Sequence, residues 1–189
     1  SLIYLGFPIS SVSAKEYEML SAILLAYRWP SGNLKGETVA RCFSSLIEGC
    51  VNGVIADAVL VGQPDHLLAK IADEAGCSLV ENIDPAAGFK EAVEQARYER
   101  LLILSAEFGL ERGLIDELRD LLNFGDPADS YVLHVNPDTL FTRLFPNLAK
   151  TAGLITTSSL VKEYTHIAQP HALAKKLRRK SLTSRARHL

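Results

Sequence analysis

The chain contains 189 residues, of which 48% are hydrophobic and 22% are charged, and its formal net charge is -2. This size and composition are typical of one globular domain with a sizeable core, so we expect residues 1–189 to form a single domain. The longest apolar run, at residues 22–27, is far shorter than the roughly 20 residues of a membrane-spanning helix, which argues against an integral membrane protein.

The first part of the chain has one strand signal and one helix signal. Residues 1–18 show no clear pattern, whereas residues 20–26 have the length and apolarity of a buried strand. A loop follows at residues 27–33, marked by Pro, Gly and Asn. Thr38 is placed to cap a helix that ends at Gly49. Its apolar residues recur at helical spacing and are expected to share one buried face: Val39, Phe43, Leu46 and Ile47.

Strands and helices continue to alternate after this helix. Strands are predicted at residues 58–61 and 78–80. Helices are predicted from Asp65, the expected N-cap, to Gly76 and at residues 85–97, where Phe89 and Val93 should be buried.

The next strand lies in residues 100–107 and directs attention to a site. Four apolar residues are followed there by Ser105, Ala106 and Glu107. Central parallel strands are continuous apolar runs that turn polar where they leave the sheet. Ligands of open α/β sheets bind at this carboxyl edge. We therefore expect the functional site near Ser105 and Glu107.

The remaining elements are predicted from weaker patterns. They are an amphipathic helix at residues 110–122 (Leu114, Leu118 and Leu121 on one face), a strand at 131–135, a helical piece at 140–145, an apolar segment at 152–156 and a closing helix at 171–180. Alternating strands and helices imply parallel strands joined by right-handed crossovers. The predicted fold is therefore an α/β three-layer sandwich with a mostly parallel central sheet.

The charge is distributed unevenly along the chain. Residues 175–189 hold seven of the 20 basic residues and no acid, which leaves 13 basic against 22 acidic residues elsewhere. Such a tail can be a solvated helix end whose cations complement the helix dipole. It can instead bind phosphate, RNA or an anionic membrane surface. An anionic membrane is therefore an expected peripheral partner, and no nucleic acid is expected.

Three cysteines, Cys42, Cys50 and Cys77, show no C-x-x-C spacing. This pattern is typical of reduced core thiols in a cytoplasmic protein, which is the location that we expect. The sequence also lacks a P-loop, a dinucleotide-binding fingerprint and a nucleophile elbow, and its five histidines show no metal-ligand spacing.

The predicted elements resemble a known family in their order and spacing. Residues 20–47, 56–80 and 100–107 are similar to the nucleotide-binding half of family-two glycosyltransferases, which have the GT-A fold of the nucleotide-diphospho-sugar transferases. Residues 56–65 correspond to a family strand of the type EVIVVDDGSTD. The helical stretch 69–77 and the basic segment 173–179 also look like elements of these enzymes.

The resemblance implies a nucleotide-diphospho-sugar ligand and a divalent metal, Mg²⁺ or Mn²⁺. Family members hold the metal with a D-x-D motif at the end of the fourth strand, because the charge of the leaving diphosphate must be neutralised. This chain has Ser105-Ala-Glu107 instead, and Val61-Gly62 replace the acidic pair of the second strand. Glu107 can serve as a metal ligand or can cap the next loop. Asp65 can contact the ribose or base, or can act only as an N-cap.

The chain also has few candidates for the general base that inverting family members need. It usually lies just before the last helices, where this chain offers Glu163 and His171. The alternatives are a surface ion-pair partner for Glu163 and a helix-start position for His171.

The first loop contains candidate nucleotide contacts. Tyr27 and Trp29 can stack on a base, with Arg28 on phosphate, although a Trp beside a Pro can also be a packing plug. The segment 31–35 is also similar to the Gly-rich loop of molybdopterin-type nucleotidyltransferases. The predicted nucleotide-binding residues are Tyr27, Arg28, Asp65 and Ser105. The hypothesis is a glycosyltransferase-like protein with an eroded metal motif. The alternatives are a non-catalytic binding or assembly protein on the same fold and a nucleotidyltransferase-like enzyme.

Overall fold

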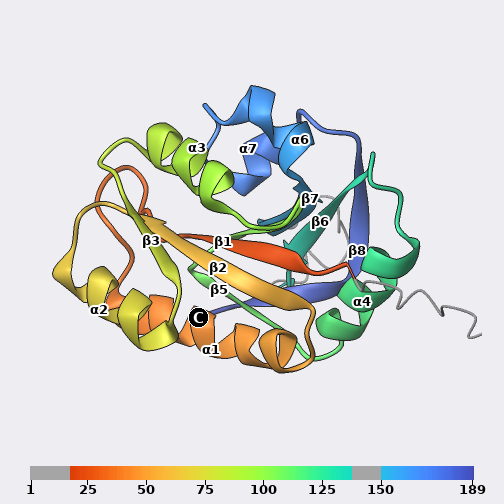
Figure 1. Ribbon diagram of the computed structural model, residues 1–189, viewed down its shortest axis with the longest axis horizontal. Helices are drawn as coiled ribbons and strands as arrows, with labels where there is room; N and C mark the ends of the chain where they lie inside the picture. Colours follow the sequence, from red (N-terminus) through yellow and green to blue (C-terminus); the bar gives the residue numbers. More distant parts are fainter. Residues whose placement is uncertain (1–17, 138–149) are drawn as a thin grey trace, which may run out of the picture.

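The central element of the structure is one eight-stranded sheet (Figure 1). The computed structural model describes residues 18–137 and 150–189. The strands are β1 Leu20–Leu25, β2 Ile55–Gly62, β3 Ser78–Glu81, β4 Arg100–Ser105, β5 Phe108–Leu110, β6 Ser130–Val135, β7 Thr151–Thr157 and β8 Arg179–His188. The helices are α1 Gly36–Val51, α2 His66–Ala75, α3 Pro85–Gln95, α4 Leu114–Phe124, α6 Ser158–Val161, the 3-10 turn η2 Lys162–Tyr164 and α7 Pro170–Ala174. The strand order is β3-β2-β1-β4-β7-β6-β8-β5.

One half of the sheet is parallel, as the alternating pattern predicts. β1 pairs in parallel with β2 and with β4, and β2 pairs in parallel with β3. All six residues of β1 are buried, because helices cover both of its faces. The chain runs from β1 outward to β2 and β3 and then returns to β4 on the other side of β1. This reversal makes the ends of β1 and β4 a topological switch point, where open α/β sheets bind ligands.

The other half of the sheet has mixed directions. β7 is antiparallel to both β4 and β6, β8 is parallel to β6, and β5 is antiparallel to β8. The two halves meet closely at Gly153, where an added Cβ would lie 2.8 Å from the carbonyl oxygen of Ile103. A side chain at this position would therefore push β7 away from β4.

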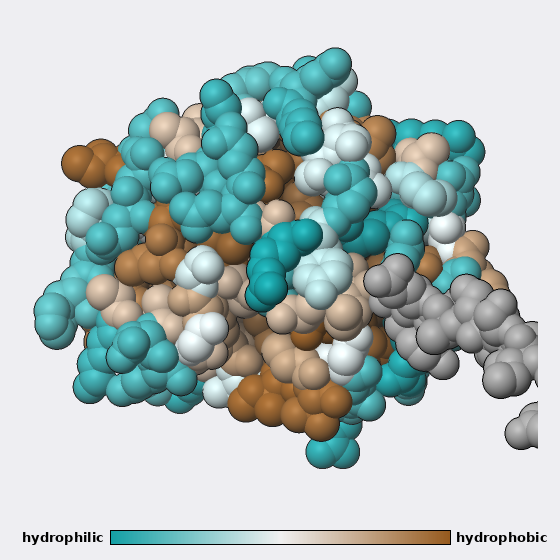
Figure 2. All heavy atoms as spheres, in the orientation of Figure 1, coloured by the Kyte–Doolittle hydropathy of each residue, from teal (hydrophilic) through white to brown (hydrophobic). Residues whose placement is uncertain are grey.

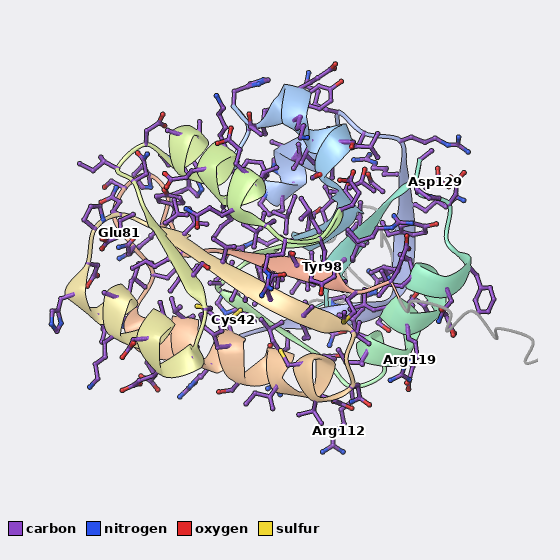
Figure 3. All side chains as sticks on the ribbon, in the orientation of Figure 1. Cys42, Glu81, Tyr98, Arg112, Arg119 and Asp129 are labelled. Carbon is purple, nitrogen blue, oxygen red and sulfur yellow. The ribbon has the colours of Figure 1, made fainter. Side chains whose placement is uncertain are left out.

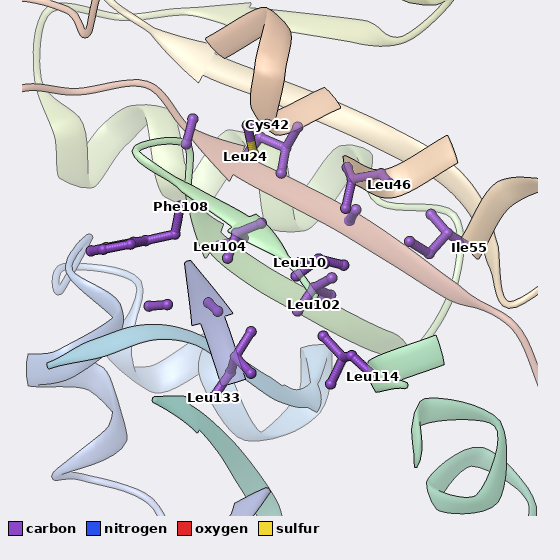
Figure 4. Packing of buried hydrophobic residues seen from close by; sticks show 14 of the residues in the cluster. Leu24, Cys42, Leu46, Ile55, Leu102, Leu104, Phe108, Leu110, Leu114 and Leu133 are labelled. Atoms are coloured by element: carbon purple, nitrogen blue, oxygen red, sulfur yellow. The ribbon is translucent and has the colours of Figure 1, made fainter. Parts of the chain in front are cut away.

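Two hydrophobic clusters lie on the two faces of the sheet. The larger includes residues of α1, α2 and α4, and the smaller includes residues of α3, α6 and α7. Figure 1 shows α1 and α2 on one side of the sheet and α3, α6 and α7 on the other. In Figure 4, Leu24, Leu102 and Leu104 of the sheet point toward the same space as Cys42 and Leu46 of α1. The predicted three-layer arrangement is confirmed.

Two predictions about α1 are wrong. The helix begins at Gly36, two residues before the expected cap Thr38, and Lys35 occupies the N-cap position without a capping side-chain bond. A Cβ on Gly36 would lie 2.3 Å from the side chain of Leu67, so glycine permits the close contact between α1 and α2. Ile47 is 59% exposed, because the buried stripe runs through Val39, Cys42, Leu46 and Gly49 instead.

The predicted ends of the chain's second half also need correction. Residues 108–110 form the short buried strand β5, and the following helix begins only at Leu114. The closing helix expected over residues 171–180 ends at Ala174, and the basic tail becomes strand β8 between β6 and β5. The helical piece expected at residues 140–145 lies outside the described residues.

The tail is fixed in the sheet by polar contacts as well as by strand pairing. The carboxylate of Glu117 accepts hydrogen bonds from the backbone N–H groups of Thr183 and Ser184, both at 2.7 Å, where the pairing of β8 with β6 shifts register. Asp129 is buried and pairs with Arg178 and Lys180. These contacts explain why the segment does not form the solvated helix end that its composition allows.

Three further observations concern membrane-spanning helices, the surface and the cysteines. Among the described residues, no helix has the length and apolarity needed to cross a bilayer. The face drawn in Figure 2 is mostly hydrophilic, with an apolar patch at its lower edge near α1, whose exposed apolar residues are Ile47 and Val51. The prediction of core thiols is confirmed for Cys42, whereas Cys77 is half-buried and Cys50 is exposed, and none of the three forms a disulfide.

Candidate functional site at the carboxyl edge of the sheet

Three loops meet at the carboxyl edge of the parallel strands: residues 26–35, 62–65 and 105–107. Leu25 is in register with both Val61 and Ser105. Backbone bonds continue past the strand ends, since Ala26 N–H donates to Val61 O at 2.8 Å and Ala106 N–H donates to Leu25 O at 2.9 Å. The switch point of the sheet is therefore a rigid edge. In Figure 3, Glu81 marks the end of β3 at the carboxyl edge of the parallel strands, and Asp129 and Arg119 lie at the opposite side of the molecule.

The first loop is held in a closed form by Asn33. Its side-chain amide donates to Gln63 O at 2.9 Å and its oxygen accepts from Gln63 N–H at 2.8 Å. Tyr27 and Asn33 also form an isolated antiparallel bridge. Gly62 is needed beside this contact, because an added Cβ would lie 2.9 Å from Asn33 Oδ1 and 2.5 Å from Leu68. The absence of an acid at position 62 thus leaves space for the locked loop.

Tyr27 lies beneath this loop. Its side chain is only 7% exposed, and its hydroxyl donates to Asn82 O at 2.9 Å. Burial and the nearby Asp84 and Glu91 raise its pKa to about 12, so the hydroxyl stays protonated. A Cβ on Gly88 would lie 2.3 Å from that hydroxyl, which shows how closely α3 covers the ring. Stacking on a base needs an open ring face, which Tyr27 does not present.

Arg28 and Trp29 lie on the exposed part of the first loop. Trp29 is 55% exposed, so the interpretation of this residue as a packing plug is wrong. Arg28 is also exposed. The loop leads directly into α1, whose first turn has no side-chain cap. An aromatic ring, a guanidinium group and an uncapped helix start thus lie within ten residues of the end of β1.

Asp65 follows β2 and acts as the N-cap of α2. Its carboxylate accepts a hydrogen bond from Leu67 N–H at 2.8 Å, which confirms the expected capping role. The same carboxylate is half-buried at the sheet edge, and its predicted contact with a nucleotide stays a prediction.

Ser105 and Glu107 lie next to each other at the end of β4. Ser105 Oγ is 3.5 Å from Glu107 Oε1, and His188 Nε2 is 3.9 Å from Glu107 Oε2. His188 packs edge-on against Phe108 with ring centroids 5.5 Å apart. Glu107 therefore faces the end of β8, while its side chain remains 41% exposed.

Beside Glu107 is a cavity of about 680 Å³, which we name the basic pocket. Its lining comes from the β5 turn, β6, the start of β7, α7 and β8: Glu107, Phe108, Val132, His134, Lys150, Thr151, His171, Lys175, Arg179 and Ser181. His134 Nε2 lies 3.2 Å from Ser181 Oγ across the cavity wall. Three cations face one carboxylate here, so the cavity favours an anion.

A second cavity, of about 520 Å³, lies at the opposite edge of the strands. It is lined mainly by uncharged residues, together with Glu18 and Arg119. This edge holds the amino ends of β1 and β4, where an α/β sheet does not bind its ligand. We therefore place the candidate site at the basic pocket and the loops beside it.

The structure brings two of the predicted site residues together. Glu107 and His171 line the same cavity, although 64 residues separate them in the sequence (171 − 107). Glu163 is exposed in η2 and is not part of the pocket lining. Arg28 and Asp65 lie on the loops of β1 and β2, on the parallel side of Ser105.

Sequence reasoning missed most of the charge in this pocket. Lys150 stands alone before β7 and has no pattern that would identify it. Lys175 and Arg179 belong to the basic tail that the composition identified, but the closing helix predicted there did not place them beside Glu107. His134 follows the alternation of β6, which places it on the same face as Val132.

The described residues do not fit a protein-bound metal ion. Among residues 18–137 and 150–189, no group of three or more His, Cys, Asp or Glu side chains is arranged to hold one. Mg²⁺ and Mn²⁺ prefer several oxygen ligands, and the lone carboxylate of Glu107 has cations as neighbours. Glu107 is the one carboxylate of the basic pocket, and its metal role, with water and phosphate oxygens as the other ligands, stays a prediction.

Known structures share this fold over most of the chain. A mannosyltransferase from Pyrobaculum calidifontis, in complex with GDP-Man and Mn²⁺, has a TM-score of 0.66 at 11% identity and matches 92% of this chain and 57% of its own. The 4-diphosphocytidyl-2C-methyl-D-erythritol synthase of Anaerococcus prevotii has a TM-score of 0.62 at 10% identity, with 92% and 90% covered. HddC from Yersinia pseudotuberculosis, complexed with GMP-PN, has a TM-score of 0.60 at 11% identity, with 89% and 92% covered.

No protein-family model and no curated protein sequence matches the chain. At these identities, the structural likeness establishes the fold alone. That fold is the nucleotide-diphospho-sugar transferase type, which nucleotidyltransferases and GT-A glycosyltransferases share. The resemblance inferred from the order of the elements is thus confirmed for the fold.

Proposed function

We propose that this protein binds a nucleotide-diphospho-sugar at the carboxyl edge of β1, β2 and β4. The observation that carries the proposal is the switch point between β1 and β4. An exposed loop containing Arg28 and Trp29 follows β1 there, and the basic pocket begins at Glu107, just after β4. The edge thus combines a flat aromatic surface for a base with cations for phosphate.

In this proposal, Trp29 and Arg28 of the first loop contact different parts of the nucleotide. Trp29 stacks on the base, a contact worth about 1–3 kcal/mol per base in nucleic-acid complexes. Arg28 offers a planar, permanently charged group to phosphate. Ser105 and Asp65 face the ligand from the ends of β4 and β2. Tyr27 supports the loop from below and does not touch the base.

Catalysis requires a base that accepts the proton of an acceptor hydroxyl. His171 is the better placed of the two predicted residues, because it lines the basic pocket with Glu107 whereas Glu163 does not. With the metal motif eroded, transfer depends on the pocket side chains. The rival function is a non-catalytic binding protein that keeps the nucleotide site without transfer.

The test is a thermal-unfolding screen against UDP, GDP, CDP and their common sugars, each with EDTA and with Mn²⁺ or Mg²⁺. A ligand at 100 times its Kd should stabilise the fold by about 2.7 kcal/mol, which shifts the midpoint by several degrees. Trp29→Ala should reduce the shift without changing the midpoint of the free protein. Phe124→Ala, which removes an 81% exposed ring on α4, is the matched control. A flat screen with folded protein would contradict the proposal.

A nucleotidyltransferase is the second candidate. The feature that favours it is the first loop, where residues 31–35 are similar to the Gly-rich loop of nucleotidyltransferases and Lys35 directly precedes α1. In this case the ligand is a nucleoside triphosphate, and the product is pyrophosphate. Release of pyrophosphate from CTP, GTP or UTP in the presence of sugar phosphates would favour this function over glycosyl transfer.

A further inference from the structure

The basic pocket carries fixed positive charge beside Glu107, the residue for which the family resemblance predicts a metal ion. With its histidines neutral, the cavity has a net charge of +2, from the three cations Lys150, Lys175 and Arg179 and the one carboxylate Glu107. A diphosphate needs its negative charge neutralised when it binds, by a metal ion or by Lys and Arg side chains. Since the described residues lack a metal-binding group, the side chains are the available source.

None of these three cations forms an ion pair with another residue of the described ranges. Within the described residues, the paired cations of this region are Arg178 and Lys180, which both contact the buried Asp129. Successive side chains of a strand point to opposite faces. Arg179 therefore points away from Arg178 and Lys180 and lines the pocket instead. Arg179 and Lys180 thus lie on opposite faces of β8, with Arg179 in the pocket and Lys180 on Asp129.

The pocket cations are attached to well-anchored backbone. Lys175 directly follows Leu173 and Ala174, which are each only 1% exposed. Arg179 begins β8, which pairs with β6 from its first residue. Lys150 precedes Thr151 of β7, and its carbonyl oxygen accepts from Val135 N–H at 2.8 Å. The three charges thus come from three segments that the sheet holds in fixed relation, which limits the entropic cost of binding.

We infer that Lys150, Lys175 and Arg179 bind the diphosphate of the ligand and replace the divalent metal. The inference rests on the proposed function, whose nucleotide site adjoins this pocket at Glu107. In this arrangement Glu107 is not a metal ligand. Its carboxylate repels the diphosphate, and the contact with His188 at 3.9 Å directs it toward the end of β8.

Titration calorimetry of the full chain with inorganic pyrophosphate in EDTA tests the pocket without a nucleoside. Pyrophosphate should bind in EDTA and should bind more weakly as salt concentration rises. Lys175→Gln and Arg179→Gln should each raise Kd about 10-fold, since a charge-assisted hydrogen bond is lost. Lys176→Gln is the matched control, because Lys176 is also exposed, is adjacent in sequence and is absent from the pocket lining. It should leave Kd unchanged.

Glu107→Gln separates the two roles of the carboxylate. If fixed cations hold the diphosphate, this variant should bind pyrophosphate more tightly than the wild type in EDTA, because a repelling charge is removed. If Glu107 holds a metal, pyrophosphate should bind only with Mg²⁺ or Mn²⁺, and the variant should bind more weakly. The second result would overturn the inference.

Two further outcomes separate this inference from the function on which it rests. Binding of UDP, GDP or CDP that is insensitive to Lys175→Gln and Arg179→Gln, with no binding of pyrophosphate, would overturn the pocket role and leave the nucleotide site standing. Binding of pyrophosphate with the expected variant effects, but of no nucleotide, would support the diphosphate pocket and contradict the proposed nucleotide function. Thermal unfolding of each variant without ligand confirms that it is folded.

Discussion

The parallel and mixed halves of the sheet follow different rules. In the parallel half, β1 and β4 are almost entirely buried, and helices connect each strand to the next. In the mixed half, β8 alternates exposed polar residues with the buried Leu182 and Ala186. The parallel half therefore supplies a rigid edge, and the mixed half supplies most of the charge that faces it. The buried strands that stabilise the fold and most of the charges proposed to bind the ligand therefore lie in different halves of the sheet, which join between β4 and β7.

The largest expected effect compares the cores of the two halves. Leu102→Ala in β4 should lower the free energy of unfolding by about 2–5 kcal/mol, because Leu102 is fully buried between two paired strands. Leu182→Ala in β8 should cost less, since that strand lies next to the sheet edge, where the structure can relax. Urea unfolding of both variants measures the difference. Equal losses would mean that the two halves share one uniform core.

A smaller effect is expected from the contact that fixes β8. Glu117→Gln should cost about 1 kcal/mol, because two charge-assisted hydrogen bonds weaken while solvent screens the partly exposed carboxylate. Partial burial opposes ionisation of Glu117, but hydrogen bonds from Ser184 and Thr183 outweigh it and hold its pKa below the usual 4.5.

The sign of the pH dependence follows from this lowered pKa. The stabilisation is present above about pH 4.5 and is lost as the pH falls through the lower pKa of the folded state. The difference in unfolding free energy between wild type and Glu117→Gln should therefore shrink under acid conditions. A difference that stays constant from pH 7 to about pH 3 would contradict the assigned role of the carboxylate.

Asp65 allows a similar test in the parallel half. Asp65→Ala should destabilise the protein by about 1 kcal/mol through loss of the α2 N-cap. Asp65→Ser keeps a capping oxygen and removes the charge, so its stability should approach that of the wild type. If Asp65 also contacts the nucleotide, the Ser variant should still lose affinity. Full affinity in the Ser variant would restrict Asp65 to its structural role.

The smallest expected effect is a difference in the rate of thiol labelling, which reports on the parallel half because all three cysteines lie there. Burial raises the pKa of Cys42 to about 12 and that of Cys77 to about 11, and it raises the pKa of the more exposed Cys50 as well. Reaction with a thiol reagent should therefore be fastest at Cys50 and should reach Cys42 only when the core opens. Mass spectrometry of partly labelled protein gives the order. Early labelling of Cys42 would show that α1 leaves the sheet readily.

The sequence allowed the parallel half of the fold to be predicted because its signals are local. The apolar runs of β1, β2 and β4 and the N-cap Asp65 are each recognised within a few residues. The strands β5 and β8 were missed because their pairing is not local. Phe108 pairs with His188, which is 80 residues later in the chain (188 − 108). β5 is only three residues long, and β8 has too few apolar residues to be identified as a strand by itself.

The candidate site was predictable to a similar extent. Glu107 was identified because it follows a buried strand, and His171 because few candidate bases remain late in the chain. Their common cavity depends on α7 ending at Ala174 so that the chain can return as β8. Lys150 joins the same cavity only through the pairing of β7 with β4 and β6. Such convergence is a property of the sheet and not of any short motif.

The interior place of β8 also constrains the order of folding. This strand is synthesised after all the other described strands, yet it lies between β6 and β5. A nascent chain that ends before residue 179 can assemble the parallel half, but it leaves β6 with an open edge and β5 without a strand partner. Pairing across such a long sequence separation is slow. The basic pocket, which needs Arg179 and Ser181, is therefore completed last, after the edge that it adjoins has already formed.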